Sequence, residues 1–128
     1  MGRSISGPTY LGAVEWMHGF QRRMAGWWAE DGFDALVSPV LNGPPPPLGW
    51  LTDPEQGMTR VLEMLQYTAQ FNITGQPAVS LPLHSTTGGL PVGVQFTAAF
   101  GREDLLVRLA SQLEQAKPWA GRHPQIHA

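Results

Sequence analysis

The sequence contains no cysteine. This absence excludes disulfide bonds, thiolate metal sites and a cysteine nucleophile, because each of these needs a cysteine sulfur. Charge is also scarce, since charged residues make up 14% of the chain, against about 25% in an average domain. The formal net charge of −2 gives no electrostatic basis for binding nucleic acid or an acidic membrane.

Long apolar runs are missing as well. No run approaches the roughly 18 residues that a membrane span requires. The first stretch, MGRSISGPTY, has no apolar core and does not resemble a secretory signal. We therefore predict a cytoplasmic protein that binds neither nucleic acid nor a membrane. The length of 128 residues suits one domain, residues 1–128.

Five tryptophans stand out against this low charge. A small domain has proportionally more surface than a large one and should need more charge. Part of the surface is therefore expected to meet protein rather than water, as in a homo-oligomer. A neutral monomer surface is the alternative that composition leaves open.

The segment 7–31 is predicted to form a helix. Ser6 can cap it, Pro8 stands where a missing N–H is no loss, and Gly32 is a stop signal. Apolar residues recur at three- and four-residue steps, which indicates one packed stripe. That stripe contains Leu11, Val14, Met17, Met24 and Trp28.

The short apolar run 33–41 follows this helix. It lacks polar alternation, which is typical of a strand covered on both faces in a parallel or mixed sheet. Pro39 cannot donate to a ladder, so the strand is expected to end near Ser38. The segment 42–57 is then a Pro-rich internal connection. Its prolines match a PxxP ligand of SH3-type domains, but we favour a stiff loop within the fold.

A second helix is expected to begin at Asp53 and Pro54, with Gln56 completing a capping box. It should end around Asn72, because the glycine and proline that follow cannot sustain it. Its expected buried stripe consists of Val61, Leu62, Leu65, Thr68 and Ala69.

A β-hairpin is predicted from strands at 78–83 and 92–98, joined by a turn in which Gly88 and Gly89 allow positive φ. Pro82 predicts a free or bulged position in the first strand. Gly93 predicts a close backbone neighbour.

The last predicted helix begins at Glu103 and Asp104, which favour the positive end of the helix dipole, and it ends at Lys117. Its expected stripe consists of Leu105, Leu106, Leu109, Ala110 and Leu113. The order helix, strand, helix, strand, strand, helix indicates an α/β fold.

Catalytic chemistry is hard to find in this sequence. The four histidines lack the converging partners of a zinc site, so we predict neither a metal nor a cofactor; they are His18, His84, His123 and His127. Ser38 and Ser80 do not stand in a nucleophile elbow, and no glycine-rich stretch has the lysine of a phosphate loop. From its residues alone, the chain is predicted to be a scaffold.

Four motifs, in order and spacing, resemble the end of the amidase signature family. The run 71–80, FNITGQPAVS, matches the family's Phe-Asn-x-x-Gly-x-Pro-Ala-x-Ser pattern, and 89–95, GLPVGVQ, matches Gly-Leu-Pro-x-Gly-x-Gln. The strand FDALVSPVL and the DLL of the last helix are similar to two further family motifs. Within the family, the sequence FNITGQPAVSLPL together with KPWAGRHP most resembles amidases of the cyclic-amide, nylon-oligomer type.

The resemblance implies the mixed-sheet portion of the amidase fold, carried by the carboxy-terminal segment of a serine hydrolase. The family's Ser-Ser-Lys machinery lies upstream of these motifs. The lone lysine of this chain, Lys117, stands at a helix end, so no catalytic residue carries over.

The resemblance also implies structural roles. A part of the substrate-cleft wall is expected at Val40, Leu65, Phe71 and Asn72. The structural motif residues are Gly75, Pro77, Ser80, Gly93 and Gln95. Asn72 and Thr74 are expected to fix the turn from helix to strand through side-chain bonds to backbone.

We therefore expect a carboxy-terminal amidase fragment that is inactive alone and acts on a small amide only with the rest of the enzyme. Its expected partner is the missing amino-terminal part or a second copy of the chain. The alternatives left open are a self-associating interaction module and a subunit that complements a separate catalytic chain.

Overall fold

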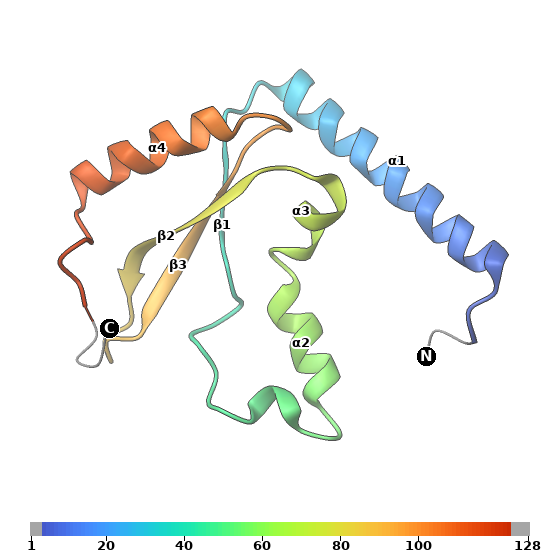
Figure 1. The fold of residues 1–128 in the computed structure, drawn as a ribbon, viewed down its shortest axis with the longest axis horizontal. Helices are drawn as coiled ribbons and strands as arrows, with labels where there is room; N and C mark the ends of the chain where they lie inside the picture. The colour runs from blue at the N-terminus through green and yellow to red at the C-terminus, as the bar shows by residue number, and fades with distance from the viewer. Residues whose placement is uncertain (1–3, 124–128) are drawn as a thin grey trace.

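The computed structural model describes residues 4–123. Three strands form one sheet in the order β1-β3-β2, and both outer strands pair antiparallel with β3. Helix α4 packs on one face of this sheet (Figure 1). The other face carries the chain around Tyr67 and the loop that follows β1.

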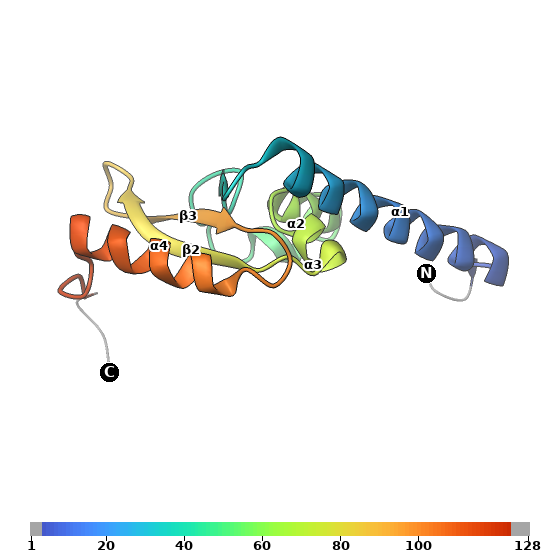
Figure 2. The same cartoon turned by 90° about the horizontal axis from the view of Figure 1, so that it is seen from above.

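Helix α1 spans Gly7–Asp31, as predicted. The Thr9 N–H donates to the Ser6 side chain, and Gly32 ends the helix in the left-handed conformation with φ +69°. The packed stripe is shorter than predicted, because Trp28 is buried whereas Leu11 is 66% exposed. The first half of α1 projects away from the sheet (Figures 1 and 2).

Strand β1 spans Leu36–Pro39, one residue beyond the predicted end. The Ala98 N–H donates to the Pro77 carbonyl, so the backbone groups of Ala98 face β2. Because successive residues of a strand direct their N–H and C=O groups to opposite sides, those of Gln95 face β1. The backbone nitrogen of Pro39, which carries no hydrogen, therefore faces away from β3, where no ladder bond is lost. The prediction that both faces of this strand are covered is wrong for the described chain, because Val37 is 58% exposed.

The second helix begins later than predicted. A 3-10 helix, η2, spans Trp50–Thr52, and α2 begins at Gly57. The Asp53 carboxylate accepts from the N–H groups of Glu55 and Gln56, and these two bonds lower the pKa of Asp53. The expected capping box is half formed: the Asp53 carboxylate accepts from the Gln56 N–H, but the Gln56 side chain accepts from Arg60 rather than from the Asp53 backbone.

The second helix is also broken in two. Helix α2 spans Gly57–Leu65 and α3 spans Ala69–Thr74. The break releases the carbonyl of Tyr67, which accepts from Gln95 Nε2 at 3.0 Å. The same nitrogen lies 3.2 Å from Ser38 Oγ, so one buried side chain ties the break to β1 and β3.

The predicted stripe of this helix is only partly packed. Leu62 and Leu65 are 64% and 44% exposed, which contradicts the predicted burial of these two residues. Val61, Thr68 and Ala69 are half-buried. The turn after α3 also differs from the prediction, because the Thr74 hydroxyl hydrogen-bonds to the Gln76 side chain rather than to backbone.

The hairpin is confirmed. Strand β2 spans Ala78–Ser85 and β3 spans Pro91–Thr97, and the register shifts between Leu81 and His84. This irregularity includes Pro82, where a bulged or free position was predicted. Gly89 adopts φ +83°, as its place in the turn predicted, whereas Gly88 does not take a positive φ.

Helix α4 spans Glu103–Ala116, close to the predicted bounds. Its predicted stripe is confirmed: Leu106 is buried, and Leu105, Leu109, Ala110 and Leu113 pack around the core. The core consists of Leu81, Phe96, Ala98 and Leu106. Burying a large apolar side chain contributes about 1.5–3 kcal/mol. The hairpin and α4 therefore form the best-packed unit of the described chain.

The predicted α/β fold class is confirmed, with the second helix divided and the three described strands antiparallel. Within residues 4–123, no helix is both long and apolar enough to cross a membrane.

Gly57→Ala should destabilise the chain. A Cβ at Gly57 would lie 2.3 Å from the Leu51 carbonyl oxygen, a backbone atom that cannot move away cheaply. We expect the free energy of unfolding to fall by about 1–3 kcal/mol in urea titrations followed by circular dichroism. Gly12→Ala is the control, because nothing lies within 4 Å of its added Cβ, and it should raise stability by up to about 1 kcal/mol. Equal effects of the two changes would contradict the contact at Gly57.

Gln95→Leu should also destabilise the chain. Leucine keeps the apolar bulk but leaves the Tyr67 carbonyl and the Ser38 hydroxyl without their donor. An unsatisfied buried polar group costs about 1–3 kcal/mol, which the same urea titration measures. Ser38→Ala is the control, because it keeps the bond from Gln95 to Tyr67, and its effect should stay below about 1 kcal/mol. A neutral Gln95→Leu would show that this bond does not hold the helix break.

Candidate substrate-cleft wall

A polar row crosses all three strands on the face opposite α4. Ser38 pairs with Gln95, and Gln95 pairs with Ser80, so the three side chains lie side by side on one face. The Gln95 side chain is 5% exposed, which places its hydrogen bonds out of competition with water. The row fixes the position of the segment that follows β1.

Gly93 lies at the end of this row, beside Ser80. A Cβ on Gly93 would lie 2.7 Å from Ser80 Oγ and 3.0 Å from Val40 Cγ2. Gly93 therefore allows two side chains to approach its backbone. The sequence predicted a close neighbour here, but that neighbour is side chain and not backbone as expected.

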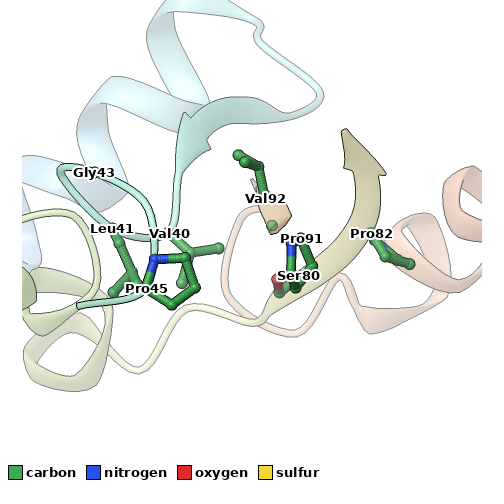
Figure 3. A pocket seen from close by; sticks show the side chains of 9 residues that line it. Val40, Leu41, Gly43, Pro45, Ser80, Pro82, Pro91 and Val92 are labelled. Carbon is green, nitrogen blue, oxygen red and sulfur yellow. The ribbon is translucent and has the colours of Figure 1, made fainter. Parts of the chain in front are cut away.

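A cavity of about 290 Å³ opens at this point, between the loop after β1 and the β2–β3 hairpin (Figure 3). The loop contributes Val40, Leu41, Gly43 and Pro45. The hairpin contributes Ser80, Pro82, Pro91, Val92 and Gly93. None of these lining residues ionises, so the cavity can enclose an apolar group but cannot supply a general base.

The four predicted cleft-wall residues belong to different segments of the chain. Val40 lines the cavity described above. Leu65 lies at the end of α2, and Asn72 is exposed on α3 without a side-chain hydrogen bond to any described residue. Phe71 is 5% exposed, so it offers almost no surface to a ligand. Whether these residues form one cleft wall stays a prediction.

The motif residues occupy turns and pairing positions. Gly75 ends α3 with φ +72°, and its N–H donates to the Phe71 carbonyl. Pro77 accepts from Ala98 at the start of the β2–β3 ladder. Together with the Ser80, Gly93 and Gln95 contacts, these positions set the register of the hairpin against the helix break.

Of the loop residues at the cavity, only Val40 was predicted as part of the wall. The sequence did not indicate that Leu41, Gly43 and Pro45 line the same cavity. Pro91 and Val92 belong to the GLPVG motif and line the cavity beside Gly93. Both motifs, FDALVSPVL and GLPVGVQ, were recognisable in the sequence. Which of their residues face one another depends on the strand register, which the sequence did not predict.

The carboxylates with shifted pKa values lie away from this cavity. The hydrogen bond from Arg102 is the main cause that lowers the pKa of Asp104, at the exposed start of α4. No group of three His, Asp or Glu side chains converges as a metal site within residues 4–123. His127 lies outside the described residues.

Known proteins with similar sequence are longer than this chain. It is 40% identical to the 6-aminohexanoate-cyclic-dimer hydrolase of Pseudomonas sp. (strain NK87) over 95% of its own length and 26% of the relative's length. It is 41% identical to the putative amidase AmiC of Mycobacterium leprae over 84% of this chain and 23% of that protein. The chain thus spans about a quarter of these relatives.

The fold is shared with solved structures. The structure of a 6-aminohexanoate cyclic dimer hydrolase complexed with substrate superposes on 96% of this chain with a TM-score of 0.86 and 39% identity, and this chain covers 27% of it. A crystal structure of an amidase gives a TM-score of 0.68 at 26% identity over 90% of this chain and 26% of its own length. The family model described as Amidase matches residues 2–107. The chain belongs to the amidase signature family.

Proposed function

We propose that this chain is the carboxy-terminal part of an amide hydrolase, supplies strands and part of the substrate-cleft wall, and is inactive alone. The shared fold with the cyclic dimer hydrolase supports this proposal, because the same strands and helices make up about a quarter of that enzyme. The cytoplasmic location stays a prediction.

The exposed apolar surface of the described chain carries the proposal. Large apolar side chains lie open on α1, before and on β1, and on α2: Tyr10, Leu11, Trp16, Phe33, Val37, Met58, Leu62 and Leu65. Large apolar side chains exposed in this number indicate surfaces that contact protein. In the proposed enzyme, the remaining three-quarters of an amidase cover these side chains.

The reaction assigned to the whole enzyme is hydrolysis of an amide C–N bond through an acyl-serine intermediate. A Ser-Ser-Lys relay in the rest of the enzyme would supply base and acid. Lys117 does not fit that role, because its ammonium donates to the Leu83 carbonyl at the far end of α4. This chain would contribute shape: its apolar cavity suits the methylene groups of an aliphatic amide.

A second candidate rests on the same exposed side chains. Two copies of the chain could cover one another's apolar surface and form an interaction module. A complementing subunit would instead need a separate catalytic chain. The two readings differ in whether turnover depends on a partner of different sequence.

The purified chain should not hydrolyse the 6-aminohexanoate cyclic dimer. Product formation would be followed by chromatography at high protein concentration, with the Pseudomonas hydrolase as the positive control. The expected rate equals that of buffer. Turnover that survives repurification and is lost in Ser38→Ala would contradict the proposal.

A chimera should restore turnover. This chain would replace the matching quarter of the Pseudomonas hydrolase, and we expect amide hydrolysis within about tenfold of the parent, which corresponds to about 1.4 kcal/mol. Gly93→Val in the chimera is the control, because its side chain would displace Ser80 and Val40 and should lower kcat/KM. A folded chimera without activity would sink the proposed function.

A further inference from the structure

The sequence contains two asparagines, and they differ in the features that decide whether an asparagine amide is chemically stable. Asn42 is followed by Gly43, in the exposed loop between β1 and η2. Asn72 is followed by the β-branched Ile73, within α3. The reaction at issue is attack of the next backbone nitrogen on the side-chain amide carbon. A small following residue and an unrestrained backbone favour it.

The backbone around Asn42 is not held by hydrogen bonds. Within residues 4–123, no partner bonds to the Asn42 side chain, and the Gly43 N–H donates to no acceptor. Both residues are exposed, and neither belongs to a helix or strand. The prolines at 44–47 have no N–H with which to build a ladder of their own. The torsion between Asn42 and Gly43 can therefore rotate until the nitrogen meets the amide carbon.

Open space surrounds Gly43. Apart from its two chain neighbours, no heavy atom lies within 4 Å of a Cβ built on this glycine. Gly43 is not among the glycines with positive φ, so a residue with a side chain fits its backbone without strain. The missing Cβ is thus what leaves the Gly43 nitrogen uncovered, and Gly43→Ala can cover it without disturbing the fold.

Asn72 lacks both conditions. The helical backbone of α3 fixes the torsion between Asn72 and Ile73, and Gln21 Nε2 donates to the Ile73 carbonyl at 2.5 Å. The branched Cβ of Ile73 crowds the nitrogen that would attack. Since the Asn72 side chain is also exposed, exposure does not distinguish the two asparagines. Asn72 therefore serves as an internal control for the backbone and for the following residue.

We propose that Asn42 is a site of spontaneous deamidation in this chain. The Gly43 nitrogen bonds to the Asn42 Cγ, the Cγ–Nδ2 bond breaks, and Nδ2 leaves as ammonia with the proton of the Gly43 N–H. Water then opens the cyclic imide. Cleavage between the nitrogen and Cγ gives aspartate, and cleavage between the nitrogen and the backbone carbonyl carbon gives isoaspartate. The rate rises with hydroxide concentration, because the attacking nitrogen must lose its proton.

The product changes the loop beside two cavities. Asn42 and Glu63 line one cavity of about 350 Å³, and none of its described lining residues is cationic. Deamidation places a second carboxylate there, and like charges in one site disfavour each other. Leu41 and Gly43, on either side of Asn42, line the apolar cavity beside Gly93. An isoaspartate would lengthen the main chain in that wall, because its backbone runs through Cβ and Cγ.

The test is peptide mapping by mass spectrometry of the folded 128-residue chain during incubation at mildly alkaline pH. Asn42 should convert at least about tenfold faster than Asn72, a barrier difference of about 1.4 kcal/mol. Gly43→Ala should slow the conversion of Asn42 by about tenfold and keep the circular dichroism spectrum. Fragment spectra distinguish aspartate from isoaspartate, and both products are expected.

Unfolding in guanidinium chloride separates the effect of sequence from that of structure. The rate at Asn42 should differ by less than about threefold between the folded and unfolded chain, whereas Asn72 should convert faster once α3 is lost. An Asn42 that converts only in the unfolded chain overturns the inference, because the loop then restrains the amide. Equal rates in the parent chain and Gly43→Ala also overturn it, since the Gly43 nitrogen would not be the attacking group.

This inference does not rest on the proposed function. The measurement follows a mass change in the chain itself and needs no turnover of a substrate. An inactive chimera therefore contradicts the proposed function and leaves the deamidation site standing, whereas a stable Asn42 contradicts the site alone.

Discussion

The carboxamide of Gln95 is the contact on which the arrangement of this chain depends. It lies on the central strand, 5% exposed, and bonds to the Tyr67 carbonyl and the Ser38 hydroxyl. Three segments far apart in the sequence are held by one side chain: β1, the α2–α3 break and β3. Because a buried carbonyl without a donor is costly, the break can exist only where this amide reaches it. The loop that lines the cavity follows directly from β1.

The described chain divides into a closed part and an open part. The β2–β3 hairpin and α4 bury Leu81, Phe96 and Leu106 around one another, and Arg122 and Lys117 close the hairpin's outer edge. On α1, β1 and α2, large apolar side chains face solvent without a comparable core beneath them, whereas the exposed Val107 of α4 and Leu90 of the hairpin turn belong to elements that pack around this core. The proposed function accounts for this contrast, since in that proposal the rest of an enzyme about four times as long packs on the open surfaces.

Local signals in the sequence predicted the elements that are determined by residues close to them in the chain. Ser6 and Gly32 marked the ends of α1, the α4 stripe was complete, and Pro82 marked the bulge, because caps, stripes and prolines act within a few residues. The helix break was not predictable, since it depends on Gln95, which is 28 positions from Tyr67. The late start of α2 depends on the fit of Gly57 against the Leu51 carbonyl. At the site, Val40 was predicted, but the facing Pro91 and Val92 needed the strand register.

The most direct test of an open and a closed part is backbone amide hydrogen exchange on the 128-residue chain. The amides of β3 and α4 should exchange slowest, because they belong to the unit with its own core. The amides in the first half of α1, around Tyr10 and Trp16, should exchange fastest among the helices, since little packs against them. Protection of α1 equal to that of β3 would contradict the account, because it would show that the chain covers its own apolar surface.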